Sequence, residues 1–182
     1  MPGYRGHMIG GAIAGIGCGV LSNCVGITEG FDSLFLGTGV AAASALLPDI
    51  DTHSKIQKIF NGVIIVSTLA IFSLNRANID FLSPLKMISL NDGFMGIVGF
   101  LLIAAYLVLG RLSPHSQFTH KIVGIGLFCV GAFLTLDTKL LWFSLAGFFS
   151  HIVLDMFTPA GLNVLDVKLP MQDSHGKFGL HF

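Results

Sequence analysis

The sequence predicts an all-α fold, a polytopic membrane bundle of about six transmembrane or membrane-embedded helices. Of the 182 residues, 53% are hydrophobic and only 11% are charged, whereas an ordinary soluble domain carries roughly 25% charged residues. So little charge cannot cover the surface of a soluble domain. The apolar stretches are continuous rather than alternating, which favours transmembrane helices over a β-barrel.

Six stretches without a charged residue mark the expected helices, in order 8–28, 33–47, 59–75, 93–110, 122–136 and 140–154. A crossing helix needs about 20 residues, with a range near 17–25. The first and fourth stretches qualify outright, and the others reach that length only with polar flanking residues. The second and fifth are therefore also candidates for buried helices that do not span, which leaves four or five crossings open.

Helix ends and the domain boundary follow from breaker residues. Pro48 comes directly after the second stretch, and Pro159 and Gly161 come after the sixth, which predicts a helix end near Phe157. We expect a membrane-embedded domain over residues 1–165. The polar residues 166–182 are expected to form a surface tail.

Basic residues predict the orientation. With six crossings, seven Lys and Arg residues lie on the side of the N-terminus and three lie on the far side. Because Lys and Arg favour the cytoplasmic side, we expect a multi-pass protein of the inner (plasma) membrane with both termini in the cytoplasm. A cleavable signal peptide is not expected.

Two further features exclude classes of function. The formal net charge is zero, so the charge balance does not suggest a nucleic-acid partner. The three cysteines, Cys18, Cys24 and Cys129, are odd in number and lack CxxC spacing. They therefore predict neither a disulfide framework nor a thiolate metal site.

Histidine and aspartate residues gather at the ends of the predicted helices. Under the six-crossing topology one set falls on the N-terminal side of the membrane: His7, Asp49, Asp51, His115, His120, His151 and Asp155. Imidazole nitrogens and carboxylate oxygens suit Zn²⁺, and also Mn²⁺ and Fe²⁺. We predict that these seven residues bind divalent metal ions, preferably zinc, and more than one of them.

The spacing of these residues supports that prediction. His151 and Asp155 are four apart, so on a helix they point from one face. Asp49 and Asp51 are two apart after a proline, where extended backbone would direct both to one side. Ionisable residues near the end of an apolar helix are costly and usually functional. A bound metal would acidify a water molecule for hydrolysis, and Asp51 or Asp155 can instead act as a general base.

The second histidine pair is five residues apart, which fits a loop followed by a helix start. Thr119 is expected to cap that helix. The remaining histidines, His53, His175 and His181, lie in polar surroundings, and we expect them at the surface. His53 directly follows the aspartate pair and is the strongest exception.

Three motifs in order carry a resemblance to a known family. LLPDID, HSQFTH and GFFSHIVLDMFTPAG, with His7 near the start, resemble the YdjM-like family over about residues 6–165. The family's second motif usually reads His-Arg-Gly-x-Thr-His, and here Ser116 and Gln117 replace the Arg and Gly. A histidine commonly follows the aspartate pair directly, whereas here Thr52 intervenes. The lost arginine would weaken phosphate binding, but the other candidate ligands are intact.

The resemblance implies a function. Members of the family are described as inner-membrane, metal-dependent hydrolases, distantly similar to zinc-dependent phospholipases C and single-strand nucleases. By analogy the substrate would be a phosphoester, and the membrane location favours a lipid head group. Two alternatives stay open: a divalent-metal transporter, whose sites usually lie near the bilayer midplane, and a non-enzymatic membrane adaptor whose His and Asp side chains need not converge.

Overall fold

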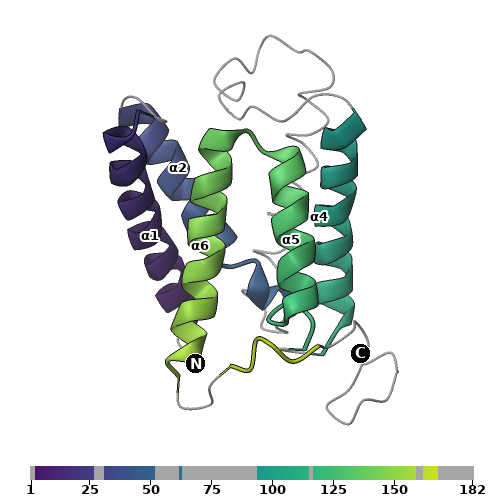
Figure 1. The fold of residues 1–182 in the computed structure, drawn as a ribbon. Helices are drawn as coiled ribbons and strands as arrows, with labels where there is room; N and C mark the ends of the chain where they lie inside the picture. The colour runs from purple at the N-terminus through teal and green to yellow at the C-terminus, as the bar shows by residue number, and fades with distance from the viewer. Residues whose placement is uncertain are drawn as a thin grey trace.

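A computed structural model describes residues 3–26, 31–51, 62, 94–114, 117–158 and 162–167, with the backbone alone at positions 31, 32 and 51. Figure 1 shows the helices found there: α1 (Tyr4–Cys24), α2 (Phe31–Ser44), the 3₁₀ helix η1 (Pro48–Asp51), α4 (Phe94–Leu112), α5 (Ile122–Thr135) and α6 (Thr138–Met156). The all-α prediction is confirmed for these residues. The third predicted stretch, 59–75, lies outside them apart from Gly62, as does most of the expected tail over 166–182.

The number of spans differs from the prediction. Among the described residues three helices, α1, α4 and α6, are long and apolar enough to cross a membrane. Helices α2 and α5 have 14 residues each, fewer than the roughly 17 that a crossing needs. Six spans are therefore not supported. Neither helix is extended at its C-terminal end, because η1 starts at Pro48 and α5 ends where Leu136 adopts extended backbone.

Close helix contacts depend on glycines that face neighbouring helices. On α1, the buried residues Gly11, Gly15 and Gly19 recur every four positions and form one stripe. A Cβ on Gly11 would collide with Ala41 of α2 and with Ala45 just after it, and a Cβ on Gly147 of α6 would overlap the backbone of Ala41. Small residues let helix backbones approach in this way inside membranes. Helices α1, α2 and α6 therefore form one tightly packed group (Figure 1).

An aromatic core joins this group to α4 and α5. Phe148 of α6 stacks on Phe128 of α5 with ring centroids 4.2 Å apart, and Tyr106 of α4 lies 5.5 Å from Phe128. Ile50 of η1 is buried in the same cluster. This packing holds η1 at the end of the bundle where α1 begins and α6 ends.

The outer faces of the helices are apolar as well. Ile13 and Val20 on α1, Leu101 on α4 and Phe133 on α5 are exposed in the isolated chain. Such exposure would be unfavourable in water but suits contact with hydrocarbon.

Candidate metal centre

Four segments distant in sequence meet at one end of the bundle. They are the first turn of α1, η1 after α2, the turn before α5 and the last turns of α6. Each contributes a histidine or an aspartate side chain. The cluster is buried, because His7, His120, His151 and Asp155 are each at most 2% exposed.

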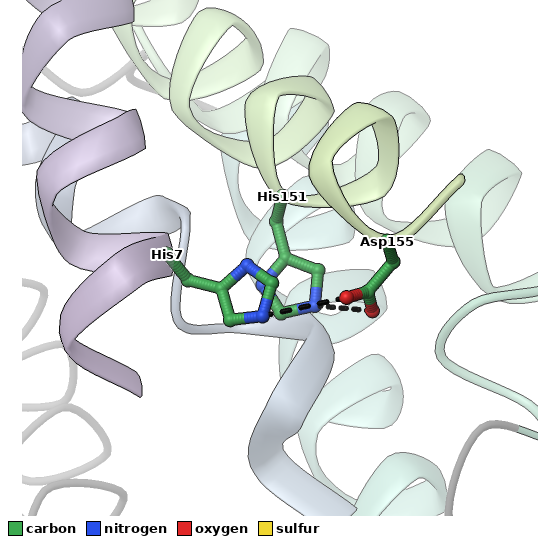
Figure 2. Close-up of side chains that lie close together, drawn as sticks. All are labelled: His7, His151 and Asp155. Atoms are coloured by element: carbon green, nitrogen blue, oxygen red, sulfur yellow. Dashed lines mark ion pairs between the residues drawn. The ribbon is translucent and has the colours of Figure 1, made fainter. Parts of the chain in front are cut away.

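The last turns of α6 provide two of these side chains. His151 and Asp155 share one face of the helix, as their spacing predicts, and His151 Nε2 lies 3.3 Å from Asp155 Oδ2. Figure 2 shows both side chains directed away from α6 toward α1. The helix ends at Met156 with Phe157 as its C-cap, which confirms the predicted end near Phe157.

His7 approaches from the first turn of α1. Its ring stacks on that of His151, with centroids 3.7 Å apart and planes inclined by 20°. His7 Nε2 lies 3.4 Å from Asp155 Oδ1, the interaction drawn in Figure 2. The glycine stripe of α1 begins one turn later at Gly11, so the close packing of α1 on α2 also positions His7 in the cluster.

The turn before α5 supplies His120. The expected helix cap by Thr119 is wrong, because the N-cap is Lys121 and no side chain caps the helix. Thr119 Oγ1 instead lies 2.9 Å from His120 Nδ1. This contact directs His120 Nε2 into the cluster, 3.1 Å from His151 Nε2 and 3.3 Å from Asp155 Oδ2.

The chain after α6 holds this turn in place. Ile122 N–H donates to the carbonyl of Val164 at 3.1 Å, and Lys121 Nζ donates to the carbonyl of Asn163 at 2.6 Å. Lys121 Nζ also lies 3.6 Å from Asp166. Since residues 162–167 follow closely on the end of α6, these contacts keep the start of α5 beside it.

The contact of His151 Nδ1 determines the orientation of the ring. His151 Nδ1 lies 2.6 Å from the carbonyl oxygen of Ala45, just after α2. A carbonyl oxygen only accepts hydrogen bonds, so Nδ1 carries a hydrogen. This contact fixes the ring so that Nε2 faces His120 and Asp155. A backbone carbonyl commonly orients metal-binding histidines in this way.

Asp49 of η1 is the fifth residue of the cluster. Its Oδ1 lies 3.7 Å from His151 Nε2, and its side chain is 14% exposed, more than that of Asp155. The expectation of extended backbone at Asp49 and Asp51 is wrong, because both lie in a 3₁₀ helix. Residues two apart in such a helix point in different directions.

The structure brings together five of the seven predicted residues: His7, Asp49, His120, His151 and Asp155. The side chain of Asp51 and all of His115 lie outside the described residues, as do His53, His175 and His181. Two overlapping groups have the spacing of a metal site, His7 with His151 and Asp155, and Asp49 with His120 and His151.

A comparison with models of protein families assigns the chain to a family. A model of the YdjM inner membrane protein family matches residues 1–182. The chain belongs to this family. Neither a comparison with curated proteins nor one with solved structures found a match. Membership in the YdjM family confirms the resemblance seen in the motifs and agrees with the long apolar helices.

The donor atoms of this YdjM family member fit one metal ion. His120 Nε2, His151 Nε2 and Asp155 Oδ2 form a triangle with sides of 3.1, 3.3 and 3.3 Å. Tetrahedral zinc, with bonds of about 2.0–2.2 Å, separates its ligand atoms by about 3.3–3.6 Å. Among the described residues Asp155 Oδ1 has no hydrogen-bond partner although it is buried, as expected of a carboxylate oxygen that binds a cation. Because an imidazole nitrogen has one lone pair, His151 cannot serve two metals at once.

Two parts of this site were missed from the sequence. The contact of Thr119 with His120 could have been anticipated, because the two residues are adjacent in HSQFTH. The carbonyl of Ala45 gives no signal in the sequence, because every residue has one.

Proposed function

We propose that the His/Asp cluster binds a divalent metal and that this YdjM family protein is an inner-membrane hydrolase of phosphoesters. The observation that carries the proposal is the environment of His151 Nε2. It faces a second imidazole nitrogen at 3.1 Å and a carboxylate oxygen at 3.3 Å. When both histidines are deprotonated at Nε2, as metal ligands are, these three atoms are all acceptors, and a metal cation between them removes their repulsion.

The chemistry divides between the two carboxylates. Both oxygens of Asp155 face histidines, which suits a ligand that holds the metal. The more exposed Asp49 can accept the proton of an attacking water at Oδ1. Asp51 stays a second candidate for this base, as predicted. The bound metal would supply Lewis-acid activation of the phosphoryl group.

The position of the cluster supports a substrate at the membrane surface. His7 lies in the first turn of α1, and Asp155 is the residue before the last of α6. Arg5, Arg111 and Lys121 lie toward this end of the bundle, and Lys139 lies at the start of α6, at the other end. This distribution supports a multi-pass protein with its cluster and termini at the cytoplasmic face. We therefore propose a lipid head group as the phosphoester. A site at helix ends is less suited to transport than one at the midplane.

A substrate screen tests the proposal. Purified full-length protein, supplied with Zn²⁺ or Mn²⁺, is incubated with phospholipids, isoprenoid phosphates and nucleotides. We expect release of phosphate or a phosphorylated head group from one class. Asp155→Ala should lower the rate by about 100-fold or more, because it removes the carboxylate that would hold the metal and with it the stabilisation of the transition state, whereas His175→Ala should keep the rate. Metal-dependent flux into proteoliposomes without hydrolysis would contradict the proposal and favour transport.

The contact between Thr119 and His120 gives a further prediction. Thr119→Val keeps the shape of the side chain but removes the oxygen next to His120 Nδ1. We expect metal affinity to fall about 10–100-fold, the range found when outer partners of metal-binding histidines are removed. Isothermal titration with Zn²⁺ measures this change. Thr119→Ser keeps the hydroxyl and should bind normally, and equal affinities for the two variants would contradict an orienting role.

A further inference from the structure

A groove runs along the contact between α1 and α6, away from the His/Asp cluster. It has a volume of about 660 Å³ and is lined by α1 from Ala14 to Val25 and by α6 from Trp142 to Phe149. Gly17 and Ala146 leave space in the groove, because glycine has no side chain and alanine has only a methyl group. The hydroxyl of Ser22 in the lining donates to the carbonyl of Gly19 at 3.1 Å. The lining is thus suited to an aliphatic ligand.

The groove is closed toward the cluster. Gly10 lies one turn before Ala14 on α1, and the side chain of Leu154 occupies the space next to it, where a Cβ would otherwise point. The lining of the groove therefore begins at Ala14 and does not extend past Leu154 to the cluster. At its other end it reaches Val25 and Trp142, near the end of α1 and the start of α6, which lie at the same end of the bundle in Figure 1.

The dimensions of the groove favour a hydrocarbon chain. From Ala14 to Val25 the helix rises about 16 Å, at about 1.5 Å per residue, which is close to half of the roughly 30 Å hydrocarbon core. A volume of about 660 Å³ over that length gives a mean cross-section of about 40 Å². Aliphatic carbons pack at about 3.5–4.0 Å, so an extended hydrocarbon chain fits within this cross-section.

A lysine stands at the open end of the groove. Lys139 is exposed, and it lies three residues before Trp142 and seven before Ala146, so it shares the groove face of α6. Tryptophan rings prefer the membrane interface, and a lysine there attracts anionic lipid. We propose that the groove binds an acyl chain of an anionic phospholipid from the leaflet opposite the His/Asp cluster, with the lipid phosphate next to Lys139.

Native mass spectrometry of the full-length protein tests this site with phosphatidylglycerol and phosphatidylcholine as probes. We expect the wild type to retain one phosphatidylglycerol, and Gly17→Leu to lower its occupancy at least about tenfold, because the new side chain fills the groove. Gly39→Leu on α2 is the matched control. Both glycines are exposed and have nothing within 4 Å of an added Cβ, so neither leucine should disturb the fold.

Lys139→Gln tests the head-group contact without altering the groove. It should lower the preference for phosphatidylglycerol over phosphatidylcholine by about fivefold, the effect of one lysine near an anionic surface. Equal lipid retention by Gly17→Leu and Gly39→Leu, or no lipid on the wild type, would overturn the proposal. A change of oligomeric state in Gly17→Leu alone would assign the groove to a second copy and overturn it too. Neither readout depends on metal or hydrolysis, so the two proposals fail separately.

Discussion

His151→Ala is expected to abolish metal binding by the purified protein. His151 Nε2 is within 3.3 Å of donor atoms on both His120 and Asp155, and its ring also stacks on His7. Asp49 Oδ1 lies 3.7 Å from the same nitrogen, so His151 approaches all four other described members of the cluster. Removing it should weaken the affinity by more than about 100-fold, beyond the range found for outer partners of metal ligands. Metal analysis after gel filtration and titration with Zn²⁺ measure this loss.

The control separates the site from metal bound elsewhere on the protein. His175→Ala also removes one imidazole, from a region where the sequence predicts a surface residue, and should keep the wild-type metal content. His151→Gln keeps a polar side chain but lacks the imidazole and should bind as weakly as His151→Ala. Full metal content in His151→Ala would refute the metal site and the proposed hydrolase with it.

Gly147→Val is expected to give the largest loss of stability. A Cβ at this position would overlap the backbone of Ala41 on α2, and backbone cannot rotate aside as a side chain can. Overpacking usually costs about 1–3 kcal/mol, and we expect at least the upper value. Helix α2 would move away from α6, and the carbonyl of Ala45 would no longer reach His151 Nδ1. The variant should therefore also lose metal.

Unfolding in increasing mole fractions of SDS measures the change in stability. Gly39→Val on α2 is the control, because an added Cβ there meets nothing within 4 Å. It replaces the same residue type in a helix of the same group. If Gly147→Val and Gly39→Val unfold at the same SDS fraction, the close contact between α2 and α6 is not as tight as described.

Much of the fold could be predicted because it depends on local pattern. A long uncharged run specifies a helix in a membrane, since unpaired backbone groups are too costly in hydrocarbon. The predicted starts and ends of α4, α5 and α6 agree with the structure within two residues. The number of crossings could not be predicted in the same way. Helices α2 and α5 are mostly apolar but only 14 residues long, and apolarity does not distinguish burial in protein from burial in lipid.

Part of the candidate site was also visible in the sequence. The four-residue spacing of His151 and Asp155 places both on one helix face whatever surrounds them. The turn at Asp49 was different, because Pro48 starts a 3₁₀ helix there rather than extended backbone. A proline restricts its own backbone and that of the residue before it, but it does not determine the backbone after it.

The sequence by itself therefore determined the helical membrane fold, the family and the identity of the polar residues near the helix ends. Only the tertiary structure decided which of them meet, and how His151 and His120 are oriented by the carbonyl of Ala45 and the hydroxyl of Thr119. It also showed Leu154 closing the groove next to Gly10. The reason is physical: helix formation and insertion depend on neighbouring residues and the solvent, whereas these contacts depend on helix packing at sub-ångström precision.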